Sequence, residues 1–259
     1  MYIDVYRYMY CADWISDLSP LSSCTKLKQL IIQCQVSDLT PLSSMPLDPL
    51  SSMPLDPLSS MPLLEHLRTG CSPPDHEIFS NLAPLSSCKN LKDLNLKCLS
   101  VTDISPLSSL SLLEYLDLDL ERLDGYPSVK NISPLSHCKK LKYLYVQGDN
   151  EITDLSPLCQ CPDLEILCID SLPLIKDLSL LEKGFLKLRV LSISYLPVDD
   201  LSPLTRLQNL QEFRCSEIPE TTSLLPLARC YKLKSVSCSV NAKDFEELRG
   251  MRPQLFKHY

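Results

Sequence analysis

Residues 91–107, LKDLNLKCLSVTDISPL, contain the two patterns that decide the fold of this chain. The first pattern, L-x-x-L-x-L, places leucine at residues 91, 94 and 96, and the second reads Asp-Ile-Ser-Pro-Leu at residues 103–107. Both patterns recur in this order along the sequence. Self-similarity of this kind indicates a repeat architecture, in which each unit is one small structural element.

The proline of the second pattern serves as a marker for the repeats. After Pro84 the intervals between markers are 22, 28, 23, 23, 23 and 23 residues. The markers are Pro20, Pro41, Pro84, Pro106, Pro134, Pro157, Leu180 in the place of a proline, Pro203 and Pro226. Nine clear L-x-x-L-x-L units follow, and Val5, Tyr8 and Tyr10 fit a degenerate tenth unit at the start of the chain.

Each unit is expected to contain one strand and one short turn of helix. The alternation of Leu94 and Leu96 predicts a strand with one buried face. We expect Ser105 to cap the following turn and Pro106, which has no N–H, to occupy its first position. One unit cannot bury its leucines alone, so neighbouring units must supply the core, at roughly 1.5–3 kcal/mol per fully buried side chain.

This combination of patterns resembles the leucine-rich repeat family, in particular its internalin-like class of 22–23-residue repeats. The resemblance implies an α/β fold: a curved right-handed solenoid of about 9–10 repeats, with a parallel sheet on the concave side and short 3₁₀ or α turns on the convex side. The family usually has asparagine three residues after the last strand leucine. Here that place holds Gln35, Leu99 or Leu172 in different units, which leaves open what satisfies the backbone there.

The repeats predict the domain boundaries. We expect the solenoid to span residues 1–240, with residues 1–16 as a degenerate unit or cap. Residues 43–50, SSMPLDPL, are repeated verbatim in residues 51–58, so residues 43–58 are interpreted as a duplicated insertion on the convex side; a proline-rich ligand segment is the alternative. Residues 241–259 contain a short amphipathic helix and are expected to form a C-terminal cap.

Charge and cysteine usage narrow the classes of partner and compartment. The net charge of −7 and the pI of about 5.1 argue against nucleic acids and anionic membranes as partners, because these require clustered Lys and Arg. The first residues do not resemble a signal peptide, and no apolar run approaches a membrane span. Thirteen cysteines in a chain rich in leucine favour a reduced, cytoplasmic protein over a disulfide framework.

The cysteines and histidines, which could bind a metal or act in catalysis, are better explained by their positions in the repeats. Five cysteines stand four residues after a marker proline and are expected to face the core: Cys24, Cys88, Cys138, Cys161 and Cys230. The pair Cys159 and Cys161 lacks the second half of a zinc site. None of the four histidines belongs to a recognisable nucleophile motif. We therefore expect no enzymatic activity, no cofactor and no metal.

The variable strand positions are the candidate binding site. Strand side chains alternate, so residues between the leucines face away from the core. Tyrosines and aspartates gather there on the middle units, at Tyr115, Asp117, Asp119, Tyr143, Tyr145, Gln147 and Asp170. Tyrosine is a common interface anchor, so these residues predict a monomeric, non-catalytic protein-binding module with a basic or arginine-bearing partner. The competing explanation is that aromatic residues form strands well.

Other functional classes were weighed against this one. The substrate-recognition subunit of a ubiquitin ligase would need a helical module, for which the residues before Cys11 are too few. A secreted or surface adhesin of internalin type would need export, and a purely structural repeat protein would have no defined partner. An interaction module remains the favoured prediction.

Overall fold

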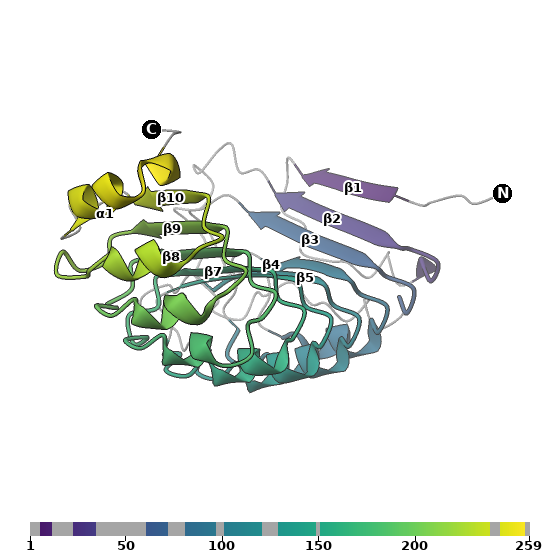
Figure 1. The fold of residues 1–259 in the computed structure, drawn as a ribbon. Coiled ribbons are helices and arrows are strands. Elements are labelled where there is room, and N and C mark those ends of the chain that lie inside the picture. The colour runs from purple at the N-terminus through teal and green to yellow at the C-terminus, as the bar shows by residue number, and fades with distance from the viewer. Residues whose placement is uncertain are drawn as a thin grey trace, which may run out of the picture.

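Ten parallel strands form one open sheet in the computed structural model, with the strands in sequence order (Figure 1). The structure describes residues 6–11, 23–34, 61–71, 81–96, 101–120, 129–148, 151–238 and 244–256. The strands are β1 (Tyr6–Cys11), β2 (Gln29–Cys34), β3 (His66–Cys71), β4 (Asp93–Leu96), β5 (Tyr115–Asp119), β6 (Tyr143–Gln147), β7 (Ile166–Asp170), β8 (Val190–Ser194), β9 (Glu212–Ser216) and β10 (Ser235–Cys238). The fold is therefore the predicted leucine-rich repeat solenoid.

Short 3₁₀ turns return the chain along the outer side of the curved sheet (Figure 1). They are η4 (Ala83–Ser87), η5 (Ser105–Ser109), η6 (Ser133–His137), η7 (Ser156–Gln160), η8 (Ser179–Glu182), η9 (Ser202–Arg206) and η10 (Leu225–Arg229). Leu94 and Leu96 in β4 and Leu107 in η5 are fully buried. The core thus lies between sheet and turns, and each repeat contributes the same leucine positions to it.

An aspartate two residues before the predicted serine caps four of the turns, η5, η7, η8 and η9. Ser105 is the first residue of η5 and Pro106 the second, and no side chain of the N-cap residue, Ile104, bonds to the turn. Asp103 accepts a hydrogen bond from the Ser105 N–H at 2.7 Å and another from the Ser105 hydroxyl at 2.8 Å. The same two bonds recur at Asp154, Asp177 and Asp200. The carboxylate has two acceptor oxygens, so each of them accepts from one of the two serine donors.

After β7 and β8, main-chain bonds take the place of the missing asparagine. Leu172, in the usual asparagine place, is a fully buried core residue. The Ser171 N–H donates to the Ser194 carbonyl at 3.0 Å, and the Tyr195 N–H to the Ser216 carbonyl at 3.1 Å. Ser171 and Tyr195 have left-handed backbones, with φ of 53° and 52°. Parallel pairing therefore extends one residue beyond these strands, which satisfies the backbone without an asparagine side chain.

The first strand is shifted by one residue from the predicted frame. Arg7 pairs with Leu30 of β2, and Met9 with Ile32, whereas the sequence interpretation aligned Tyr8 and Tyr10 with these core positions. The prediction was wrong because the segment YRYMYC has bulky residues in both phases, so its alternation does not specify a buried face. The predicted insertion at residues 43–58 lies outside the described residues.

Two short helices lie against the last repeat (Figure 1). They are α1 (Phe245–Met251) and η11 (Pro253–Phe256), within the segment predicted as a C-terminal cap. Leu248 is fully buried, and the rings of Phe245 and Phe256 meet edge to face at 5.1 Å. The Arg252 guanidinium donates to the carbonyls of Cys230 (2.8 Å) and Leu233 (3.0 Å). These bonds hold the helices to the last repeat through charge-assisted donors.

Candidate functional site

The seven residues predicted as a binding site lie next to one another on strands β5, β6 and β7. Tyr115 pairs with Tyr143, Asp117 with Tyr145, and Asp119 with Gln147, which in turn pairs with Asp170. All are partly buried except Asp117, which is 9% exposed. The seven are called the Tyr-Asp surface below: Tyr115, Asp117, Asp119, Tyr143, Tyr145, Gln147 and Asp170.

A pair of stacked tyrosines forms one row of this surface. The rings of Tyr115 and Tyr143 are 4.2 Å apart between centroids, with 6° between their planes. On the β3 side, the guanidinium of Arg68 lies 5.7 Å from the Tyr115 ring centroid. That contact has cation–π geometry. The faces of the Tyr115 ring are thus in contact with Arg68 and Tyr143.

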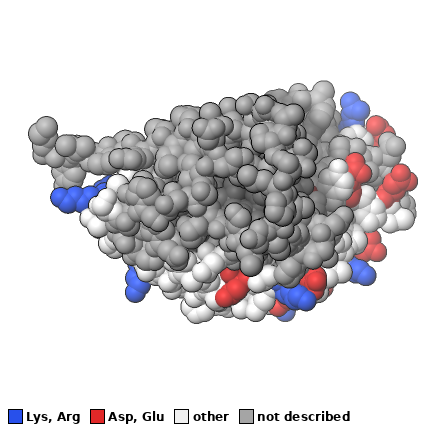
Figure 2. Space-filling view, turned by 180° about the vertical axis from the view of Figure 1, so that it is seen from behind, with Lys and Arg blue, Asp and Glu red and all other residues white. Residues whose placement is uncertain are grey.

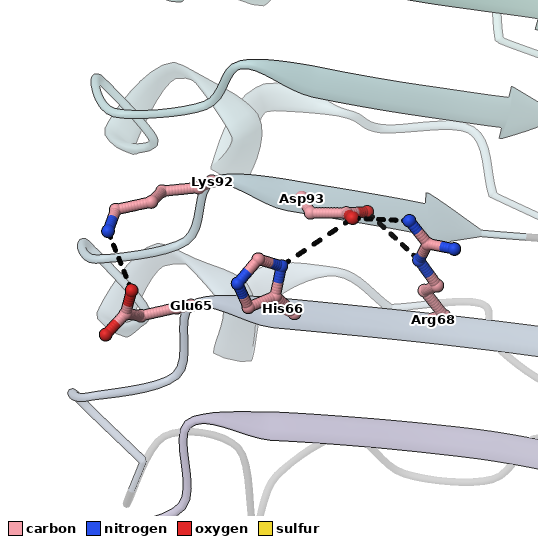
Figure 3. A network of polar contacts seen from close by, with 5 residues as sticks. All are labelled: Glu65, His66, Arg68, Lys92 and Asp93. Atoms are coloured by element: carbon pink, nitrogen blue, oxygen red, sulfur yellow. Dashed lines mark hydrogen bonds and ion pairs between the residues drawn. The ribbon is translucent and has the colours of Figure 1, made fainter. Parts of the chain in front are cut away.

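A carboxylate that Arg68 shares with His66 holds the arginine in place (Figure 3). Arg68 binds Asp93 through Nε (3.3 Å) and Nη2 (2.6 Å), and His66 Nδ1 lies 3.6 Å from the same carboxylate. The bond to Asp93 raises the pKa of Arg68 above its usual range. Bidentate arginine–carboxylate pairs are directional as well as strong. The Arg68 side chain is therefore fixed at the border of the Tyr-Asp surface.

The second and third rows of the surface are also held by hydrogen bonds, from within the surface and from adjacent residues. Asn95 Nδ2 donates to Asp117 Oδ2 at 2.6 Å. The Tyr145 hydroxyl donates to Gln147 Oε1, two residues along the same strand. Ser171 Oγ donates to Asp170 Oδ1 at 2.9 Å. Side chains held this way lose less rotamer freedom on binding, so the surface is preorganised.

The surface is negatively charged, with neutral tyrosines. Burial raises the pKa of Tyr115, Tyr143 and Tyr145, and the neighbouring aspartates raise the pKa of Tyr145 further. The tyrosines therefore stay protonated donors at neutral pH. Within their described bounds, strands β4 to β8 carry no Lys or Arg at outward positions. The middle of the concave face thus presents carboxylates between Arg68 of β3 and Arg214 of β9.

Four of the five cysteines predicted to face the core are buried, namely Cys88, Cys138, Cys161 and Cys230, and Cys24 is partly buried. Three of the buried thiols donate to a leucine carbonyl of the preceding repeat: Cys138 to Leu107 (3.5 Å), Cys161 to Leu135 (3.3 Å) and Cys230 to Leu204 (3.4 Å). Burial raises the pKa of Cys161 and Cys230 from 9.0 to about 11, and that of Cys138 to about 12. Cysteine fits here because its small side chain can also donate to a buried carbonyl.

Two other cysteines form a disulfide, which the sequence analysis did not predict. Cys215 of β9 and Cys238 of β10 are register partners with Cα atoms 4.7 Å apart and are joined by a disulfide. The two cysteines occupy the same position in consecutive repeats, and adjacent parallel strands bring such aligned residues within disulfide range. Seven described cysteines are free. In the described ranges, no three His, Cys, Asp or Glu residues are grouped so as to hold a metal.

A row of alternating charge, not predicted from the sequence, runs along the edge where the strands begin. The residue before each strand alternates in sign through Lys28, Glu65, Lys92, Glu114, Lys142, Glu165 and Arg189. Glu65 contacts Lys28 (3.1 Å) and Lys92 (2.7 Å; Figure 3), and Glu114 contacts Lys142 (2.7 Å). In the view from behind, basic and acidic side chains lie beside one another along the lower right rim (Figure 2). Successive members of this row are 22 to 37 residues apart in the sequence, so no short stretch of sequence shows the alternation.

Solved structures share this architecture. Internalin C2 of Listeria monocytogenes superposes with a TM-score of 0.57 and 24% identity, over 71% of this chain and 74% of that one. An internalin F of the same organism gives 0.56 and 26%, over 70% of this chain and 49% of that one. A leucine-rich repeat protein of Leptospira interrogans gives 0.54 and 18%, over 91% and 61%. The chain thus spans about half to three quarters of these proteins.

The repeat geometry and these likenesses make the chain a leucine-rich repeat protein. Its repeat is of the internalin-like class. No protein-family model matches the sequence, and no curated protein is significantly similar to it. Within the part of the chain that the structure describes, no helix has the length and apolar character needed to cross a membrane.

Proposed function

We propose that the chain is a monomeric, non-catalytic module that binds a protein through the Tyr-Asp surface, and that the partner presents a basic or arginine-bearing segment. The observation that carries this proposal is the stacked, bonded cluster of tyrosines and aspartates on the concave face. Tyrosine offers a large rigid contact area and a hydroxyl at low entropic cost. Carboxylates set apart from lysines on the described strands favour a cationic partner and speed its approach.

The arrangement of polar groups supports a role without catalysis. A hydroxyl approaches a histidine at Ser136, whose Oγ lies 3.3 Å from His137 Nδ1, but this pair is exposed on η6. The Ser136 hydroxyl already donates to the Ser133 carbonyl at 2.7 Å. A nucleophile would need a base that accepts its proton. We infer that such contacts stabilise the turns. We also propose that residues 1–240 form the solenoid and residues 241–259 its C-terminal cap.

Affinity capture with matched variants tests the proposal. The wild-type chain and Tyr143→Ala/Tyr145→Ala are used as baits, and a protein retained only by wild type is purified and titrated calorimetrically. We expect the tyrosine variant to bind it about ten-fold more weakly or worse, as for truncated interface anchors. The control, Ser192→Ala/Ser194→Ala, changes outward positions of β8 and should bind normally. Equal affinity of the tyrosine variant, with an unchanged urea midpoint, would refute the site.

The charge preference has its own test. The variant Asp119→Asn/Asp170→Asn keeps the shape of the surface and removes two carboxylates. We expect slower association and a weaker dependence of affinity on salt, because exposed charges steer association. Faster association of the variant would instead indicate an acidic partner.

We infer a reducing, cytoplasmic location from the seven free thiols. An extracellular binding protein is the second candidate, and the Cys215–Cys238 disulfide favours it. Mass measurement after alkylation of the denatured natural protein decides between them. A count of thirteen labelled cysteines supports the reducing compartment. A count lower by an even number of cysteines supports the extracellular candidate.

A further inference from the structure

The alternating charge row breaks near the C-terminal end of the sheet. Gln211 stands before β9, where Glu65, Glu114 and Glu165 stand in earlier repeats. Lys234 Nζ therefore contacts an amide oxygen, Gln211 Oε1, at 2.9 Å. An amide accepts the hydrogen bond but carries no charge to balance the ammonium group. The positive charge of Lys234 remains available on the surface.

A second substitution of the same kind lies two residues earlier. Asp163 Oδ1 binds Lys187 Nζ at 2.6 Å in one repeat pair. In the next pair, Asn209 Oδ1 takes that role with Lys232 Nζ, also at 2.6 Å. Amide side chains, Asn209 and Gln211, thus stand at both positions where an earlier repeat has Asp163 and Glu165. Two neighbouring lysines keep their charge where the earlier pattern would neutralise it.

The same and neighbouring repeats carry further exposed cations and apolar side chains. Arg206 and Arg229 end η9 and η10, are exposed, and form no ion pair with a carboxylate among the described residues. Tyr231 is 88% exposed, and Leu186, at the matching position two repeats earlier, is 75% exposed. We call the six the edge patch: Leu186, Arg206, Arg229, Tyr231, Lys232 and Lys234. Acidic residues close to these six in the sequence include Glu182, Asp200, Glu212, Glu220 and Asp244. Glu212 is paired with Arg214, and Asp244 accepts a hydrogen bond from Ser223.

We infer that the edge patch docks an acidic segment of a protein partner, separately from the Tyr-Asp surface. Four cations that have no carboxylate partner in the described ranges attract carboxylates, and two large exposed side chains supply apolar anchors. The whole chain carries a net charge of −7, so an extended anionic membrane would repel it. A short peptide senses mainly the charges within a Debye length, about 8 Å at physiological salt. The geometry therefore favours a peptide-sized acidic ligand.

Binding of a defined acidic peptide to the full chain tests this inference. The probe is a fluorescent twelve-residue peptide of Glu and Asp with two Leu residues, titrated at low and at physiological salt. We expect saturable binding that weakens with salt, and about five-fold or greater loss in Lys232→Gln/Lys234→Gln. The matched control, Lys140→Gln/Lys142→Gln, changes the same two positions in a repeat flanked by acidic neighbours and should bind like wild type.

Three results would overturn the inference. They are no saturable binding of the peptide at low salt, equal loss in the two lysine variants, or tighter binding to phosphatidylserine-containing vesicles than to the peptide. Tyr143→Ala/Tyr145→Ala should bind the peptide normally, because those residues lie on the concave strands. The edge patch and the proposed function can therefore fail independently.

Discussion

Tyr115 and Tyr143 lie face to face on neighbouring strands, with ring centroids 4.2 Å apart and planes 6° apart. We expect this stack to stabilise the sheet as well as to orient the two hydroxyls. In a double-mutant cycle of Tyr115→Ala and Tyr143→Ala, the coupling free energy should be about 0.5–1.5 kcal/mol by urea unfolding. Ile166 and Val190 occupy the same row on β7 and β8 and should couple less. Additive tyrosine effects would contradict the stack.

The Asp103 carboxylate should contribute to stability through its two bonds to Ser105. Asp103→Ala is expected to lower the free energy of unfolding by about 0.5–1 kcal/mol. Asp103→Asn should cost less, because Asn131 Oδ1 accepts the equivalent N–H at 2.7 Å.

The pH dependence of stability in the same variants distinguishes the effect of the Asp103 charge from that of its side-chain shape. The bonds from Ser105 hold the pKa of Asp103 below 3.8 in the folded chain. Its stabilisation is therefore complete above pH 3.8 and is lost as the pH falls further. Asp103→Asn should show a shallower loss of stability below about pH 4 in acid titrations, and an unchanged slope would count against this role.

Buried thiols should make the fold sensitive to alkali. Burial raises the pKa of Cys88 and Cys161 from 9.0 to about 11. The unfolded chain releases these protons above pH 9 while the folded chain keeps them, so stability falls as the pH rises from 9 toward 11. Cys161→Ala should reduce the slope of unfolding free energy against pH in that window. Cys168→Ala, a change at an outward position of β7, should reduce it less.

The alternating charge row should respond to a charge swap in a specific way. Glu114→Lys brings a lysine between Lys92 and Lys142 and should destabilise the chain. Adding Lys142→Glu restores an ion pair at that site but sets the new carboxylate beside Glu165. We therefore expect the double variant to recover only part of the loss at low salt, with the three stabilities converging in about 1 M salt. Full recovery of stability in the double variant would show that isolated ion pairs, and not the whole row, stabilise the chain.

The sequence predicted the repeats, the strands and the turns because the period of the leucines reports burial directly. Leu94, Leu96 and Leu107 are all fully buried, as their spacing indicates. The register of β1 was not predictable, since Tyr6, Tyr8 and Tyr10 compete with Arg7 and Met9 for either face. A clear buried phase is needed before a pattern can specify register.

The candidate site was predictable to the extent that it depends on alternation and register. The neighbourhood of Tyr115 and Tyr143 follows from stacking in-phase repeats, but the Arg68 contact depends on side-chain conformation. The Cys215–Cys238 disulfide and the Asp103 cap required coordinates, because each depends on a distance across repeats or across a turn. Whether the Tyr-Asp surface binds a partner stays a prediction.

The alternation of Lys92, Glu114, Lys142 and Glu165 also constrains how such a chain can grow. Duplicating one repeat in the middle of the row would place two units of like sign in contact, whereas duplicating two adjacent repeats would preserve every attractive neighbour. Gains and losses of whole repeats in pairs are therefore the tolerated changes along this edge. The number of repeats can therefore change in steps of two more readily than in steps of one.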